Sequence, residues 1–145
     1  MTVSTAMTIE ELIAEFDELG DWESKCEYLI DMGDDLADMP AALKTDANKV
    51  HGCQSNVWMT AEVGSDDART VELLADSDAK IVKGLVSVIL MAYSGRPARE
   101  ILGTDIESIF RRLGLTRHLS MARKNGLSGM VRRVRALAIE ALARS

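Results

Sequence analysis

Hydrophobic residues recur at helical spacing in the N-terminal part of the chain and predict two helices there. The first begins at Thr8, which forms a capping box with Glu11, and ends at Gly20. Its apolar stripe consists of Ile9, Leu12, Ile13 and Phe16. Asp21 caps the second helix, which stops before Met39-Pro40 because a residue that precedes proline disfavours helical geometry. One face of this second helix carries Trp22, Cys26, Leu29, Gly33 and Leu36.

The hydrophobic period changes to two after residue 56, which is typical of half-buried strands. Apolar side chains alternate with polar ones over residues 57–63 and again over residues 70–75. The intervening "GSDDA" is a turn, so the two segments predict a β-hairpin. A short strand around Lys49–Val50 is expected to add a third member. Helices must then cover one face, because two strands alone are only marginally stable.

A nearly all-apolar helix is expected next, with Ser77 or Asp78 as its cap and Gly95 after its end. Between Ile81 and Tyr93 it is hydrophobic almost all round, which predicts a buried central helix.

The C-terminal part of the chain predicts further helices. Pro97 suits the first turn of a short helix that runs through Ile101, and Thr104 with Glu107 reads as a second capping box. After "LTRHLSMARKNGL", a long amphipathic helix is marked by Leu127, Met130, Val131, Val134, Leu137, Ala138 and Leu142. Residues 1–145 therefore predict one α+β domain, with a small three-stranded antiparallel sheet covered by helices.

Charge separates along the chain and bears on the kind of partner. The 145 residues carry a formal net charge of −6, with acidic residues dominating residues 1–95 and basic ones residues 96–145. A chain this acidic is a poor polyanion binder, so the basic third is read as a solvated helix face and nucleic acid is not expected. Protein partners that recognise complementary charge fit better.

The N-terminal sequence and the thiols indicate a reducing compartment. The first residues lack the basic and apolar regions of a signal peptide, and the longest apolar run, residues 84–93, is too short to span a bilayer. Two cysteines that lie far apart in the chain do not make a disulfide framework. We therefore expect a cytoplasmic protein with free thiols, and no membrane association.

The two cysteines have different surroundings. Cys26 shares the apolar stripe of its helix and reads as a small hydrophobe. Cys53 follows Gly52, which allows a positive φ, and backbone N–H groups in such a turn can favour the thiolate. His51 would sit on the same side of an extended segment and could lower the pKa of the thiol, or could simply be exposed. From these residues alone, Cys53 is either reactive or inert.

Metal and dithiol chemistry are disfavoured. A structural zinc site needs four Cys or His ligands at close spacing, and the chain has two of each, with only His51 near Cys53. A Cys-x-x-Cys redox motif is absent, because position 56 is Asn. We therefore expect no bound metal.

Several blocks of this sequence resemble the SufE family of sulfur-acceptor proteins. "GCQSNVW" at residues 52–58 resembles the family's active-site signature. The similarity continues in register through "DSDAKIVKGL" at 76–85 and "LSMARKNGL" at 119–127, and includes the N-terminal "DWESKCEYLIDMG". It implies a fold shared with the IscU-type scaffolds of iron–sulfur cluster assembly.

The resemblance also implies a mechanism. Cys53 would accept a sulfane sulfur from the persulfide of a cysteine desulfurase, on a loop that hides the cysteine and swings out at Gly52. Gln54 and Ser55 match the motif, and Arg123 matches a family arginine expected near the cysteine loop. Asp78 matches an acidic position that either caps a helix or acts in loop opening. Cys26 and His51 have no role in the family pattern.

The resemblance finally implies partners. The pyridoxal phosphate (PLP) cofactor would belong to a desulfurase of the SufS or CsdA type, and a cluster scaffold would receive the sulfur. Two other functions remain open: a cluster scaffold, which usually needs three or four thiolates, and an adaptor that activates the desulfurase by contact alone. The sequence leaves open which desulfurase is the partner, which pathway receives the sulfur, and the oligomeric state, a homodimer included.

Overall fold

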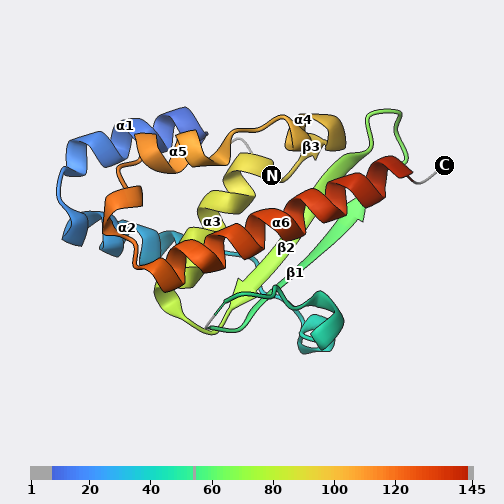
Figure 1. Cartoon of the computed structure of the whole chain (residues 1–145), viewed down its shortest axis with the longest axis horizontal. Helices are drawn as coiled ribbons and strands as arrows, with labels where there is room; N and C mark the ends of the chain where they lie inside the picture. Colours follow the sequence, from blue (N-terminus) through green and yellow to red (C-terminus); the bar gives the residue numbers. More distant parts are fainter. Residues whose placement is uncertain (1–7, 54, 144–145) are drawn as a thin grey trace.

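The computed structural model describes residues 8–53 and 55–143, and its sheet has three antiparallel strands in the order β1-β2-β3 (Figure 1). The strands are β1 (Val57–Val63), β2 (Thr70–Ser77) and β3 (Arg96–Pro97). β1 and β2 pair along their whole length, from Val57 opposite Ser77 to Val63 opposite Val71. The predicted hairpin is confirmed.

One face of the sheet is buried, as the period-two pattern predicts. Its core-facing side chains are Val57, Met59, Val71, Leu73 and Ala75. Position 58 of β1 and positions 72 and 74 of β2 point to the opposite face and keep some exposure. Helices therefore cover a single face, and α6 (Met121–Ala143) crosses in front of the two long strands in Figure 1.

The third strand is not where the sequence predicted it. Lys49 forms only an isolated bridge to Trp58, whereas the third strand is β3, which pairs with the start of β2. Gly95 makes this possible, because its φ of 79° reverses the chain and its N–H donates to the carbonyl of Val71 at 2.8 Å. The pairing depends on a turn after a buried helix, which local alternation does not reveal.

The two N-terminal helices begin where the sequence predicts, but the second ends at Asp34, earlier than predicted, and leaves Leu36 outside the helix. α1 (Ile9–Leu19) has the full capping box of Thr8 and Glu11, and α2 (Trp22–Asp34) has Asp21 as its cap. α2 crosses the central helix α3 (Lys80–Tyr93) so closely that a Cβ on Gly84 would collide with the backbone of Leu29. This contact brings the buried faces of the two helices together.

α3 is the buried central helix that the apolar run predicts, but its cap is not the predicted residue. Ala79 occupies the cap position without a side-chain hydrogen bond, and Ser77 ends β2 instead. The Ser77 hydroxyl accepts the N–H of Ala79 at 3.2 Å. Asp78 points away from the helix to another partner, so the prediction of a helix cap at Asp78 is wrong.

The remaining helices are α4 (Ala98–Leu102), α5 (Ile106–Arg112) and α6, and short 3-10 turns cover Ala41–Leu43, Asp46–Asn48 and Thr116–His118. Asp105 alone caps α5, while the Thr104 hydroxyl donates to the carbonyl of Glu100, so the second capping box is wrong.

α6 begins before the predicted start, because the Ser120 hydroxyl accepts the N–H of Arg123 and places Gly126 inside the helix. Within the described ranges, no helix has the length and apolarity needed to cross a membrane.

Candidate functional site

Cys53 lies in a short loop, residues 51–56, whose two ends are held together. The N–H of Val50 donates to the carbonyl of Val57 at 2.8 Å, and Lys49 bridges Trp58. Gly52 has a φ of 93°, in the left-handed region that glycine allows. We call residues 51–56 the cysteine loop; Gln54, a predicted site residue, lies outside the described part of the chain.

The Cys53 side chain is half-buried and turned inward, against the hydrophobic core. Its thiol donates a hydrogen bond to the carbonyl of Gly126 at 3.5 Å, and it borders a cavity of about 150 Å³. The cavity is lined by Cys53, Ser55, Val82, Leu85, Ser120, Ala122, Arg123, Gly126 and Met130. We call this arrangement the sheltered conformation. Since one water occupies about 30 Å³ of the liquid, the cavity has room for one further sulfur atom.

The sheltered conformation favours the protonated thiol. Burial raises the pKa of Cys53, and the positive charge of Arg132 only partly opposes this effect. The carbonyl oxygen of Gly126 accepts a hydrogen bond from the Cys53 thiol, and this likewise favours the protonated S–H form. The expectation that the loop stabilises a thiolate is therefore wrong for this conformation, because apolar side chains and a carbonyl face the sulfur.

Two glycines of α6 form the surface on which the cysteine loop rests. A Cβ on Gly129 would collide with the carbonyl oxygen of His51, so the loop needs glycine at that position. A Cβ on Gly126 would lie 3.5 Å from the Cys53 sulfur, which is ordinary van der Waals contact. Sequence reasoning missed both residues, because their role depends on which face of α6 meets the loop.

Asp78 closes the other end of the cysteine loop. Its carboxylate accepts the backbone N–H of Asn56 at 3.1 Å and the Asn56 side-chain amide at 2.8 Å. In return, the N–H of Asp78 donates to the carbonyl of Asn56 at 3.2 Å. Of the two roles predicted for Asp78, the structure thus places it at the loop and not at the helix cap.

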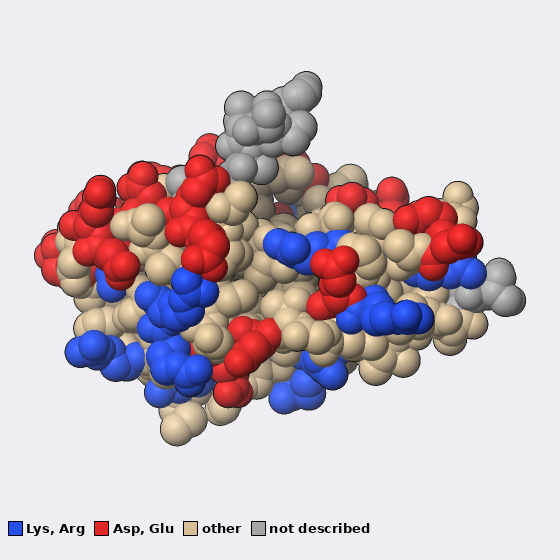
Figure 2. Space-filling model, turned by 90° about the horizontal axis from the view of Figure 1, so that it is seen from above, with Lys and Arg blue, Asp and Glu red and all other residues tan. Residues whose placement is uncertain are grey.

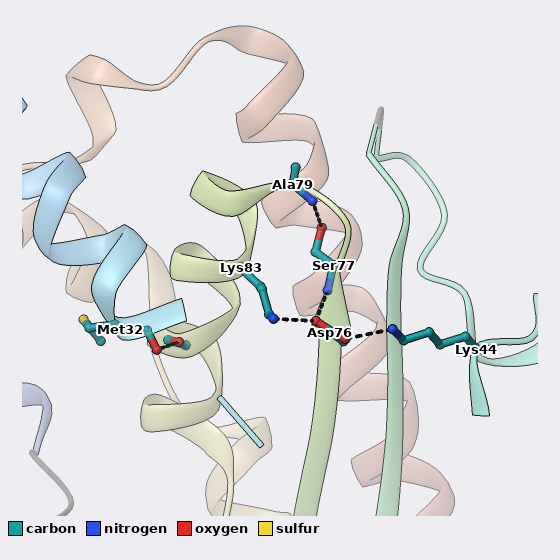
Figure 3. A network of polar contacts seen from close by, with 7 residues as sticks. Met32, Lys44, Asp76, Ser77, Ala79 and Lys83 are labelled. Atoms are coloured by element: carbon teal, nitrogen blue, oxygen red, sulfur yellow. Dashed lines mark hydrogen bonds and ion pairs between the residues drawn. The ribbon is translucent and has the colours of Figure 1, made fainter. Parts of the chain in front are cut away.

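A cluster of charges anchors the strands beneath the loop (Figure 3). Asp76, opposite Trp58 in the sheet, pairs with Lys44 at 3.1 Å and with Lys83 at 3.4 Å, and it accepts the N–H of Ser77 at 2.8 Å. The Lys44 ammonium also lies 5.4 Å from the centre of the Trp58 ring. Burial alone would raise the pKa of Asp76, but the hydrogen bonds from Lys44 and Ser77 and the charge of Lys83 outweigh it and lower that pKa. The cluster ties both long strands to α3.

Two arginines of α6 flank the cysteine. Arg123, predicted to lie near the loop, lines the cavity beside Cys53. Arg132 was not predicted, yet its Nη2 would be 3.5 Å from a Cβ on Gly52, and its charge acts on Cys53. Nothing in the sequence singles out Arg132 among the arginines of this helix.

The other candidate residues lie at the edges of the site. Ser55 is half-buried and lines the cavity, whereas His51 is exposed. The positive charge that acts on Cys53 is that of Arg132. Cys26 is half-buried on α2 rather than in the core; burial raises its pKa, and Arg123 opposes the rise.

Metal ligands do not gather in the described part of the chain. Across residues 8–53 and 55–143, no group of three or more His, Cys, Asp and Glu side chains is placed to hold a metal ion. Both cysteines are free thiols. The site therefore offers one sheltered sulfur, a small cavity and nearby cations.

Comparison with known proteins gives a consistent result. The sequence model of the SufE family, described as a Fe-S metabolism associated domain, matches residues 10–138. An uncharacterized SufE-like protein of Rhizobium etli is 40% identical over 129 residues, 88% of this chain and 87% of that protein. A SufE-like protein of Rhizobium meliloti, also uncharacterized, is 40% identical over 129 residues, 88% of this chain and 92% of its own.

A solved structure supports the fold. The solution structure of a hypothetical protein from Thermus thermophilus superposes with a TM-score of 0.74 at 20% identity, over 95% of this chain and 100% of that one. At this level of identity, the similarity concerns the fold alone.

Proposed function

Because the chain belongs to the SufE family, whose domain is associated with iron–sulfur metabolism, we propose that it accepts sulfane sulfur on Cys53. The donor is a cysteine desulfurase, and the sulfur is passed on for cluster assembly. The observation that carries the proposal is the placement of Cys53. Its side chain is half-buried beside a cavity, on a loop whose end is held closed by the hydrogen bonds between Asn56 and Asp78.

The transfer is a thiol exchange with a persulfide. The Cys53 thiolate attacks the terminal sulfur of the donor's persulfide, a new S–S bond forms at Cys53, and the donor's own S–S bond breaks. The donor's cysteine leaves as a thiolate and takes up the proton that Cys53 has lost. No external oxidant or reductant is needed, since one persulfide is consumed and one is made.

Loading requires the cysteine loop to open. In the sheltered conformation the pKa of Cys53 is raised by burial, and the thiol is the weaker nucleophile. Outside the cavity, water solvates the sulfur and the effect of burial on its pKa is removed, so the thiolate becomes more accessible. After loading, the cavity has room for the added sulfur and protects it from solvent thiols.

The partner supplies the cofactor chemistry in this proposal. Pyridoxal phosphate on the desulfurase releases sulfur from cysteine, and this chain contributes the acceptor thiol. Gly52 and Ser55 shape the loop, Asp78 closes it, and Arg123 lines the cavity. Two free thiols fit a reducing cytoplasm.

The experiment is a desulfurase stimulation assay with a panel of cysteine desulfurases and two matched variants. Cys53→Ser should abolish stimulation, while Cys26→Ser should retain it, because Cys26 lies on α2 outside the cavity. Circular dichroism spectra and thermal melting of both variants check that the fold is kept. Full stimulation by a folded Cys53→Ser protein contradicts the proposal and favours an adaptor that acts by contact.

A further inference from the structure

A second hollow lies between α5 and α6 and is separate from the cavity at Cys53. It has a volume of about 530 Å³, and its floor consists of apolar side chains from both helices and the turn that joins them. These floor residues are Ile106, Phe110, Leu119, Leu127 and Val131. We call this hollow the α5–α6 groove.

The walls of the groove are two helix faces. α6 contributes Lys124, Leu127, Ser128, Val131 and Arg132, which follow the spacing of a single helical stripe. This stripe spans about 12 Å at 1.5 Å per residue, the length of roughly two helical turns. A groove between two helix faces, with an apolar floor of this length, suits a short amphipathic helix.

The rim of the groove is basic and belongs to the basic C-terminal third of the chain. Arg111, Lys124 and Arg132 border it, against one acidic residue, Glu107. None of these three cations takes part in an ion pair with another described residue. Figure 2 shows basic side chains gathered beside acidic ones at the end of the molecule that carries α1 and α5. Because the rim is cationic and the floor apolar, the complementary ligand has carboxylates beside its apolar face.

Arg132 connects the groove to the cysteine loop. It forms part of the groove wall, and its guanidinium also lies beside Gly52 and acts on Cys53. A ligand in the groove would therefore contact the residue that also faces the cysteine loop. In the proposed function, the protein that must reach Cys53 is the sulfur donor, so a ligand of the groove beside the cysteine loop is best matched to that donor.

We propose that the α5–α6 groove binds an acidic amphipathic helix of the sulfur-donating desulfurase, and that this contact docks the donor beside the cysteine loop. The proposal rests on the proposed function for the identity of the partner. It adds a contact outside the Cys53 cavity that sets the affinity of the complex and leaves the sulfur-transfer step to Cys53.

The test measures binding of the full-length chain to the same panel of immobilised desulfurases by biolayer interferometry. The Cys53→Ser background prevents sulfur transfer during the measurement. Lys124→Glu reverses a rim charge, and its matched control is Arg99→Glu on α4, exposed and outside the groove. Ser128→Trp fills the groove from an exposed position, and its control is Ala136→Trp, exposed on the same helix but not lining the groove.

We expect Lys124→Glu and Ser128→Trp each to weaken binding by about fivefold or more, and both controls to stay within about twofold. The effect of Lys124→Glu should shrink at high salt, because exposed charges are screened. Binding by both groove variants at the wild-type level overturns the inference, even if Cys53 is loaded normally. Conversely, loss of binding in the groove variants supports it, even if Cys53 turns out not to carry sulfur.

Two further outcomes also decide the matter. A photoreactive benzoylphenylalanine in place of Glu107, exposed on the rim of the groove, should crosslink to an acidic helical peptide of the desulfurase, identified by mass spectrometry. A crosslink to a second copy of this chain, with a change of oligomeric state in sedimentation, overturns the inference. If wild-type protein binds none of the desulfurases, both the groove inference and the proposed function fail.

Discussion

Asp78 holds Asn56 through both its backbone N–H and its side-chain amide, at 3.1 and 2.8 Å. The two residues belong to different segments, the end of the cysteine loop and the turn between β2 and α3. This pairing joins the loop to the sheet without covering the cysteine itself, so it can open without disturbing the core. We therefore expect Asp78 to control how readily the cysteine loop opens.

Replacing Asp78 should therefore expose Cys53. Asp78→Ala removes the acceptor of two hydrogen bonds, each worth about 1 kcal/mol, and should raise the population of the open loop by about tenfold or more. The rate of Cys53 alkylation by iodoacetamide, which reports the open population, should increase accordingly.

Asp66→Ala is a matched control. Asp66 likewise accepts a backbone N–H and a side-chain donor, both from Thr70, but at the opposite end of the hairpin. Its replacement should leave the alkylation rate of Cys53 unchanged. Equal rates for the Asp78 and Asp66 variants would remove the case for Asp78 as the closure of the loop.

The two glycines of α6 should respond to alanine in opposite ways. Gly129→Ala places a methyl group against the carbonyl of His51, so it should displace the loop, speed alkylation of Cys53 and destabilise the protein by about 1–3 kcal/mol. Gly126→Ala meets only ordinary contact at 3.5 Å and should stabilise α6 by up to about 1 kcal/mol through helix propensity.

Urea unfolding and thiol alkylation measure both effects of the glycine substitutions. Destabilisation by Gly126→Ala equal to that of Gly129→Ala would show that the close approach of His51 to α6 does not hold the loop.

Local patterns predicted much of this fold. The capping box at Thr8, the cap at Asp21 and the alternation over residues 57–63 depend on neighbours in sequence, and all three are confirmed. Predictions failed where a local signal competed with a distant partner. Asp78 looks like a helix cap but binds Asn56, and Lys49–Val50 looks like a strand but forms an isolated bridge.

The candidate site divides in the same way. The position of Cys53 and the freedom of Gly52 to adopt a positive φ could be read from a glycine-marked turn. The raised pKa of Cys53 and the closeness of Arg132 to Gly52 could not be predicted from the sequence, because both depend on how α6 crosses the loop. Gly129 is equally hidden, since its neighbour His51 is distant in the sequence.

Arg132 should set the pH at which Cys53 becomes reactive. Its positive charge lowers the pKa of the thiol against the larger effect of burial, so Arg132→Gln should move that pKa upward. The midpoint of the pH profile for Cys53 alkylation should shift to higher pH, and the difference should shrink at high salt. Arg99→Gln, on a helix away from the cavity, should leave the midpoint in place. A downward or absent shift in the Arg132 variant would contradict this electrostatic role.

Asp76 should stabilise the protein in a pH-dependent way. Its pKa in the folded state is lowered from the ordinary 3.8, so its stabilisation is complete above that value and is lost as the pH falls through the folded pKa. Asp76→Asn should reduce the free energy of unfolding by about 2 kcal/mol at pH 7, since charge-assisted hydrogen bonds to Lys44 and Ser77 are weakened.

Urea unfolding of the wild-type and Asp76→Asn proteins, followed from neutral to acid pH, tests this. The two stabilities should converge as the wild-type carboxylate becomes protonated. A difference that stays constant through the acid range would assign the effect to packing. Glu72→Gln, an exposed carboxylate on the same strand, controls for the loss of one negative charge.

A sulfur acceptor, a cluster scaffold and a contact adaptor differ in whether the protein comes to hold sulfur and in which chemical form. A cluster scaffold would develop visible absorbance after anaerobic reconstitution with iron and sulfide. Only two thiols are present in the whole chain, fewer than such clusters usually require. An adaptor would stimulate a desulfurase and remain unmodified.

The proposed function requires that one sulfur atom at position 53 can leave its cavity, receive a second sulfur and return. Peptide mass spectrometry after incubation with desulfurase and cysteine tests this most directly. We predict a gain of one sulfur atom on the peptide that contains Cys53, reversed by a reducing thiol. A gain confined to Cys26, or an unmodified chain alongside an active and stimulated desulfurase, would contradict the account.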